Sequence, residues 1–143
     1  MNEDLIGLRE ILTSRKVAAL GTLHGGAPFV SMVPFALLED GSAFLIHVSE
    51  LSAHTQDMLT DSRVSLLITE FESAETLPQA LARVTVLGQA SPIDDDARST
   101  LLRWATWTDF PIPRPCSGSA IFRCLQSGRR RFGGSAGSRP PNP

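Results

Sequence analysis

The chain has 143 residues, which is enough for one domain with its own hydrophobic core. Its composition, 42% hydrophobic and 20% charged, is that of a soluble globular protein, and no apolar run approaches the roughly 20 residues that a membrane-spanning helix needs. The net charge of −2 argues against a general nucleic-acid-binding protein. We therefore expect neither a membrane nor a nucleic-acid partner, and a cytoplasmic location because the N-terminus is acidic and amphipathic, unlike a secretory signal.

The distribution of charge and of metal-ligating residues excludes further classes. Six of the 13 basic residues but only one of the 15 acidic residues lie after residue 108, so the first 108 residues carry seven basic and fourteen acidic groups. Cys116 and Cys124 are eight residues apart, and no histidine follows His54. This spacing fits neither a zinc knuckle nor a CxxC redox pair, so we expect no metal site.

The first half of the chain begins with a helix and continues as a hairpin. Apolar residues at helical spacing predict an amphipathic helix over residues 4–15. Residues 16–24 and 27–38 are rich in Val, Ala, Leu and Phe, and they flank the pair Gly25 and Gly26. Two glycines between apolar runs favour a tight turn, so these runs are predicted to be the first two strands.

A third strand, a second helix and a fourth strand follow. The turn signal at residues 39–41 precedes an apolar strand over residues 42–48. Residues 51–60 have helical spacing, and residues 63–69 are again strand-like. The side chains of the second helix that we expect in the core are Leu51, Thr55, Met58 and Leu59.

The amino-acid composition changes in the last part of the chain. A polar loop over residues 70–79 leads to a strand over residues 81–90, in which polar and apolar side chains alternate, and a helix is predicted over residues 94–107. From residue 109 onward Pro, Gly, Ser and Arg dominate around a brief apolar patch at residues 120–122. We therefore expect a folded domain over residues 1–108 and a poorly ordered tail over residues 109–143.

The junction between the third strand and the second helix carries a cluster of polar side chains, Ser49, Ser52, His54 and Thr55. A helix start has unpaired N–H groups and the positive end of the helix dipole, so this corner could bind a phosphate. The alternative is that these residues only cap the helix, which is the commoner role of Ser and Thr at such a position.

Three segments in this order, GTLHGGAPFVSMVPF, SELSAHTQDMLTDSRVSLL and ARVTVLGQA, resemble the FMN-binding split-barrel family related to pyridoxamine 5′-phosphate oxidase, in particular its haem-utilisation branch. The resemblance covers residues 4–107. It implies a mainly β fold with flanking helices, a split β-barrel, and a homodimer with two FMN sites at the subunit interface.

The resemblance also implies the positions of cofactor-binding residues. The second strand would run beside the flavin ring and offer backbone groups to its polar edge, and the polar corner would hold the phosphate. Arg83 would approach the flavin, although an arginine on a strand is also commonly a solvent-facing residue. The complete implied set is Ser31, Met32, Val33, Pro34, Phe35, Val48, Ser49, Ser52, His54, Thr55 and Arg83.

The expected function is that of an FMN-dependent oxidoreductase with a small-molecule redox substrate and no side-chain catalyst, because the flavin carries out the electron transfer. The chain has no tyrosine and lacks the C-terminal segment with which true pyridoxamine phosphate oxidases bind their substrate, so that activity is not expected. The alternatives are a haem-binding or haem-utilisation protein and a non-enzymatic flavin-binding module. The deazaflavin F420 could replace FMN.

Overall fold

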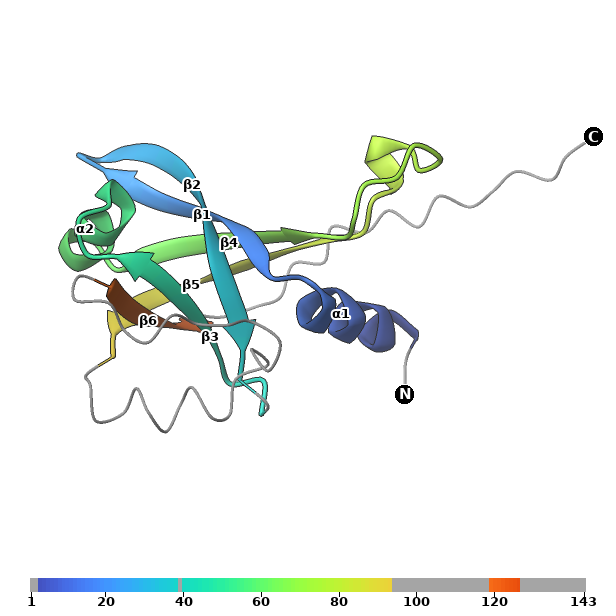
Figure 1. Ribbon diagram of the computed structural model, residues 1–143, viewed down its shortest axis with the longest axis horizontal. Helices are drawn as coiled ribbons and strands as arrows, with labels where there is room; N and C mark the ends of the chain where they lie inside the picture. The colour runs from blue at the N-terminus through green and yellow to red at the C-terminus, as the bar shows by residue number, and fades with distance from the viewer. Residues whose placement is uncertain (1–2, 39, 94–118, 127–143) are drawn as a thin grey trace, which may run out of the picture.

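The computed structural model of the protein describes residues 3–38, 40–93 and 119–126. Strands dominate these residues, with a helix at each end of the strand bundle (Figure 1). The elements in chain order are α1 (Glu3–Ser14), β1 (Val17–His24), β2 (Ala27–Leu37), β3 (Ala43–Ser49), α2 (Ala53–Thr60), β4 (Arg63–Thr69), a 3-10 helix η1 (Pro78–Ala80), β5 (Arg83–Pro92) and β6 (Ser119–Gln126).

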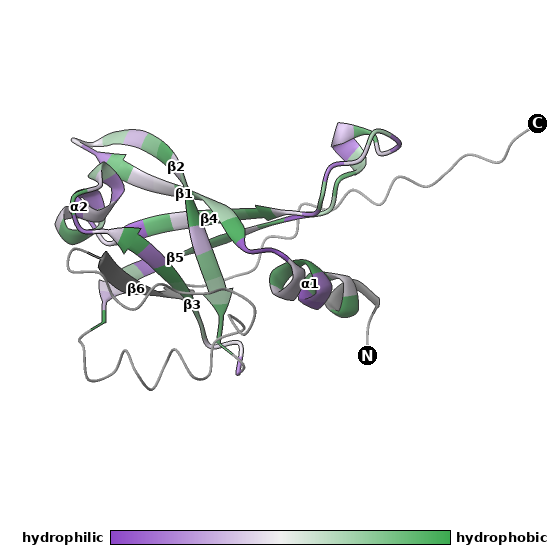
Figure 2. Ribbon diagram, in the orientation of Figure 1, coloured by the Kyte–Doolittle hydropathy of each residue, from purple (hydrophilic) through white to green (hydrophobic). Residues whose placement is uncertain are grey.

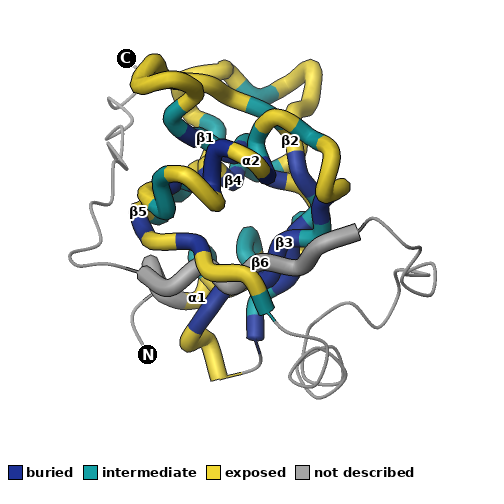
Figure 3. The backbone as a smooth tube through the Cα atoms, turned by 90° about the vertical axis from the view of Figure 1, so that its left-hand side faces the viewer, coloured by how far each residue is buried: buried dark blue, intermediate teal, exposed yellow. Residues whose placement is uncertain are grey.

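The strands form one closed antiparallel barrel in the order β1-β2-β3-β6-β5-β4. Figure 3 views the barrel from the α2 end and shows the ring of strands. The predicted class, a mainly β barrel with flanking helices, is confirmed. Closure gives every strand two neighbours along at least part of its length, which shortens the exposed sheet edges that promote aggregation.

Strand β6 differs from what the sequence led us to expect. It lies between β3 and β5, and it pairs with residues 43–49 of one and residues 88–92 of the other. These eight residues of the segment predicted as a poorly ordered tail are therefore part of the barrel. The boundary at residue 108 stays a prediction, and the predicted helix over residues 94–107 lies outside the described residues.

Local sequence explains the first hairpin. Gly25 and Gly26 have φ angles of 56° and 85°, which residues with a side chain rarely adopt. Positive φ at both central residues gives a two-residue turn whose twist matches that of the flanking strands. The hairpin register that follows pairs His24 with Ala27 and continues to Val17 and Pro34.

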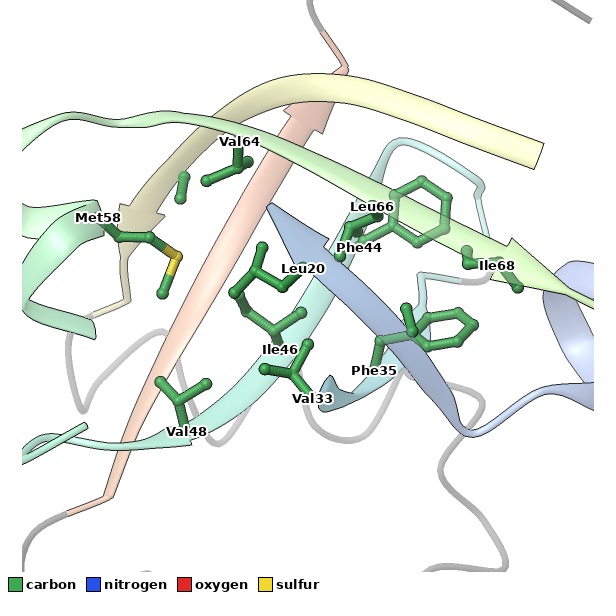
Figure 4. Packing of buried hydrophobic residues seen from close by; sticks show 12 residues of the cluster. Leu20, Val33, Phe35, Phe44, Ile46, Val48, Met58, Val64, Leu66 and Ile68 are labelled. Atoms are coloured by element: carbon green, nitrogen blue, oxygen red, sulfur yellow. The ribbon is translucent and has the colours of Figure 1, made fainter. Parts of the chain in front are cut away.

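The core fills the barrel interior with alternate residues from the strands. Leu20, Val33, Phe35, Ile46 and Leu66 are each at most 1% exposed, and Figure 4 shows their side chains converging. Hydrophobic and hydrophilic residues alternate along the strand ribbons (Figure 2), as expected when one face of each strand is buried. Ile11 and Leu12 of α1 pack against this core at one end.

Helix α2 covers the other end of the barrel, and its buried face differs from the predicted one. Thr55 and Met58 are buried as expected, but Leu51 is 92% exposed and Leu59 is 57% exposed. Leu51 precedes the helix, which begins at Ala53. The helix is rotated so that Asp57, which was not expected in the core, lies against β1, where its carboxylate has two hydrogen-bond partners.

Strands β4 and β5 continue beyond the barrel as a projecting hairpin arm (Figure 1). The guanidinium carbon of Arg15, just after α1, lies 3.7 Å from the centroid of the Phe71 ring, a cation–π contact that links α1 to the arm. No helix in the described part of the chain is long and apolar enough to span a membrane.

Candidate functional site

Strands β2 and β3 separate at the position where the predicted site begins. They pair only from Phe35 opposite Ile46 to Leu37 opposite Phe44. If the same register continued, Ser49 at the end of β3 would lie level with Met32 of β2. Instead residues 27–34 have β1 as their only strand neighbour among the described residues.

The unpaired side of β2 presents a defined set of backbone groups. The N–H of Phe35 donates to the Lys16 carbonyl on the β1 side at 3.0 Å. Because N–H groups alternate in direction along a strand, those of Val30 and Met32 point away from β1. Pro34 lies on the same side and offers only its carbonyl, since proline has no N–H. The edge therefore offers both donors and acceptors at Met32 and Val30 and an acceptor alone at Pro34.

The side chains of the same strand divide between the interior and the surface. Val33 and Phe35 are each 1% exposed and belong to the core, whereas Met32 is 74% exposed and Pro34 is half-buried. The Ser31 hydroxyl is buried and has no hydrogen-bond partner among the described residues. The predicted contribution of this strand to a ligand is therefore restricted to backbone groups and the Met32 side chain.

The polar corner is held together by its own hydrogen bonds. The hydroxyls of Ser52 and Thr55 lie 2.8 and 2.7 Å from the Ser49 carbonyl and 2.7 Å from each other. Thr55 is 1% exposed, so its hydroxyl supports the corner from inside. Ser52 is the N-cap residue, yet its side chain makes no capping bond. The Ser52 side chain therefore does not cap the helix. The Thr55 N–H already donates to the Ser52 carbonyl at 3.1 Å, so the backbone donors left for an anion at the helix start are those of Ala53 and His54.

His54 and Val48 complete the predicted corner. The half-buried His54 imidazole has its pKa lowered from 6.5, mainly because burial disfavours the charged form, and the nearby negative charge of Asp57 opposes this shift. Val48 is 5% exposed and packs in the core, so its side chain supports the corner rather than lining it.

Arg83 does not join this group. It is exposed at the start of β5 and pairs with Thr69 of β4. In the barrel order, β5 is three strands from β2, at about 4.8 Å per strand. The structure therefore brings together the β2 edge and the corner, but it leaves Arg83 on a separate part of the barrel.

A cluster that the sequence did not reveal lies beside this corner. The buried Asp57 carboxylate accepts from the Thr22 hydroxyl at 3.0 Å and from His24 Nδ1 at 2.7 Å. The His24 side chain is 61% exposed, and that of Asp57 is 6% exposed. From the sequence we expect His24 at the surface beside the Gly-Gly turn. Its hydrogen bond to Asp57, 33 positions away in the sequence, could not be predicted from neighbouring residues.

Together these groups suit a flat ligand with polar edge atoms and an anionic end. The β2 edge provides paired donors and acceptors, and the start of α2 provides backbone N–H groups and a titratable imidazole. No group of three or more metal-ligating side chains occurs within residues 3–38, 40–93 and 119–126. The groups that this region offers to a ligand are backbone N–H and C=O groups and the His54 imidazole.

Comparisons with known proteins place the fold. A family model described as pyridoxamine 5′-phosphate oxidase matches residues 7–121. No curated protein matches the chain. The chain is similar to the solved structure of HutZ, a haem storage protein from Vibrio cholerae, with a TM-score of 0.78 and 19% identity over 89% of this chain and 92% of that chain.

Two further solved structures are similar. A FAD-binding protein from Mesorhizobium loti has a TM-score of 0.65 and 19% identity, over 87% of this chain and 88% of that chain. A haem binding protein from Mycobacterium smegmatis has a TM-score of 0.68 and 33% identity over 91% of this chain. The match covers 53% of the mycobacterial chain, so the present chain corresponds to about half of that protein.

Proposed function

The chain belongs to the pyridoxamine 5′-phosphate oxidase family, and from that premise we propose that it binds FMN and acts as a flavin-dependent oxidoreductase on a small-molecule substrate. The observation that carries this proposal is the separation of β2 and β3: among the described residues the β2 edge over residues 27–34 has no β3 partner, while β3 continues to the polar corner at Ser49. A flavin ring has polar atoms along one edge and FMN adds one phosphate, which matches these two features. When bound, FMN supplies hydride or electron transfer.

The residues of the chain bind and orient the cofactor in this proposal. Backbone groups of Val30, Met32 and Pro34 hold the edge of the ring, and the start of α2 with His54 holds the phosphate. Thr55 keeps the corner in shape through its bond to the Ser49 carbonyl. None of these groups has to form a covalent bond with the substrate.

We propose that the functional unit is a homodimer. The outer face of β1, β2, β4 and β5 carries an exposed apolar patch, which we define as Val30, Met32, Leu67 and Leu87, between 39% and 74% exposed. Cross-strand pairing links the patch through the small residues Ala19 and Gly21. Exposed apolar patches of this kind mark interaction surfaces. In this proposal, Arg83, which lies away from the corner of its own chain, would approach the flavin bound by the second copy.

The phosphate assignment predicts that His54→Ala weakens FMN binding more than riboflavin binding, because only FMN carries the phosphate. We expect the affinity for FMN to fall about tenfold and the affinity for riboflavin to change little, as measured by quenching of flavin fluorescence. Thr60→Ala, at the opposite end of α2, is the matched control. Equal losses for both ligands would show that the phosphate has been assigned to the wrong residues.

Haem binding is the second candidate function. The 33% identity to the mycobacterial haem binding protein favours it, together with an exposed imidazole, that of His24, whose Nδ1 is already bonded to a carboxylate. The absorption spectrum and mass of the co-purifying ligand distinguish the candidates. Flavin absorbance that bleaches with NAD(P)H and returns in air supports the oxidoreductase, and a flavin that does not bleach supports a non-enzymatic flavin-binding module. A Soret band after addition of haemin supports the haem protein, and ligand mass separates FMN from F420.

A further inference from the structure

Asp57 connects helix α2, which holds the phosphate in the proposed site, to the hairpin of β1 and β2, whose edge holds the ring. The residue lies on α2, two positions after Thr55, and it is 5% exposed. Both carboxylate oxygens are occupied, Oδ2 by the Thr22 hydroxyl and Oδ1 by His24 Nδ1. A buried carboxylate with a specific partner on each oxygen has one preferred geometry, because leaving either side unpaired is costly.

The partners of Asp57 lie at the free end of the first hairpin. β1 pairs with β4 only over residues 19–21, so Thr22 and His24 lie beyond that ladder. Their strand neighbour in the described part of the chain is β2, through Phe29 and Ala27. The His24 ring also packs against the Phe29 ring, with centroids 5.5 Å apart. The hairpin end is thus joined to α2 through the Asp57 carboxylate.

We infer that Asp57 is a positioning residue for the ligand ring: through Thr22 and His24 it holds the open edge of β2 at a fixed distance from the polar corner of α2. The ligand class, a planar ring carrying a phosphate, rests on the proposed function. The position of the β2 edge does not depend on the proposed function, because it follows from the hydrogen bonds of Asp57 to Thr22 and His24.

This role predicts a pattern of affinities that differs from that of the phosphate corner. Loss of the Asp57 bonds frees the hairpin end over residues 22–29. This movement reaches the backbone of Val30, which faces the ring in the proposed site, because its partner Gly21 is the last β1 residue paired with β4. FMN and riboflavin share that ring, so loss of the Asp57 bonds should lower the affinity for both ligands by the same factor. Replacement of His54, by contrast, should lower the affinity for FMN alone.

The experiment compares Asp57→Ala and Asp57→Asn with the intact chain by flavin fluorescence. The affinities are measured at pH 8, where the His54 imidazole of the free protein is neutral with or without the Asp57 charge. We expect Asp57→Ala to weaken the binding of FMN and of riboflavin equally, by about tenfold, and Asp57→Asn, which keeps one acceptor oxygen, to give an intermediate loss. Val64→Ala, a buried change on β4, is the control for lowered stability alone, and it should leave both affinities unchanged. If Asp57→Ala lowers the melting temperature but leaves both flavin affinities intact, the inference is wrong.

A second measurement needs no ligand. In the free protein, Asp57→Ala should speed amide hydrogen exchange in residues 22–31 and leave the exchange of β4 and β5 unchanged. Unchanged protection of residues 22–31 would overturn the inference. An intact chain that binds neither flavin would contradict the proposed function, whereas this exchange experiment would still decide whether Asp57 positions the hairpin.

Discussion

In the proposed site, His54 is the residue that would make ligand binding depend on pH. Burial lowers its pKa from 6.5, so the folded protein binds a proton here less readily than the unfolded chain does. The contribution of His54 to stability is therefore full above pH 6.5, decreases as the pH falls below 6.5, and levels off below the lowered pKa. A bound phosphate reverses the local preference, because a nearby dianion favours the charged imidazolium.

The pH dependence of FMN affinity should follow from this coupling. Between about pH 8 and pH 6.5 the intact chain should gain affinity for FMN relative to His54→Gln, while riboflavin should show no such trend. The FMN phosphate titrates near pH 6, so the comparison is made with the variant at each pH. A parallel dependence in both proteins would mean that His54 does not contact the phosphate.

Helix α2 is the element that carries the polar corner, and Met58 is its main attachment to the core. Met58 is 2% exposed and reaches from α2 toward Leu20 and Val48 (Figure 4). Its neighbour Leu59 is 57% exposed. The two residues are similar in size and adjacent in sequence, so they form a matched pair for testing how α2 is held.

Met58→Ala should lower the free energy of unfolding by about 2 to 5 kcal/mol, because it leaves a cavity under the helix. Leu59→Ala should change it by no more than about 0.5 kcal/mol. Urea denaturation measures both. Similar losses from the two variants would mean that the helix is rotated differently from the described structure.

At the scale of the whole molecule, the barrel depends on a strand from the C-terminal part of the chain. A chain ending at residue 118 lacks β6, which leaves β3 and β5 with unpaired edges. It should lose its cooperative thermal transition and aggregate. A chain ending at Gln126 keeps all six strands and is the control. Circular dichroism melts and gel filtration compare them, and a chain ending at residue 118 that melts like the control would contradict the closed barrel.

The outer apolar patch makes a separate prediction about assembly. Leu67→Glu places a charge in its centre and should convert the proposed dimer into a monomer, since a charge buried without a partner at an interface is costly. Light scattering on the intact chain and on the variant measures this. Leu77→Glu, an exposed apolar residue on the projecting arm, is the control. An intact chain that is already monomeric would rule out the proposed dimer.

Local chemistry in the sequence was sufficient to locate most elements. Strand β4 begins and ends at the predicted residues, and the Gly25 and Gly26 turn places the first hairpin, because periodicity and turn preference act between neighbours in sequence. The corner residues were found for the same reason, since they follow one another along the chain. The one sequence feature that indicated β6 was the short apolar patch at residues 120–122.

Tertiary structure decided what depends on distant residues. Three features depend on segments whose pairing has no local signature: the insertion of β6 between β3 and β5, the hydrogen bond of His24 to Asp57, and the separation of β2 from β3 before Phe35. The rotation of α2 belongs with them: two hydrogen-bond partners on β1 turned Asp57 inward and left Leu59 outside. Such choices are set by the free energy of the assembled barrel, which short-range patterns do not contain.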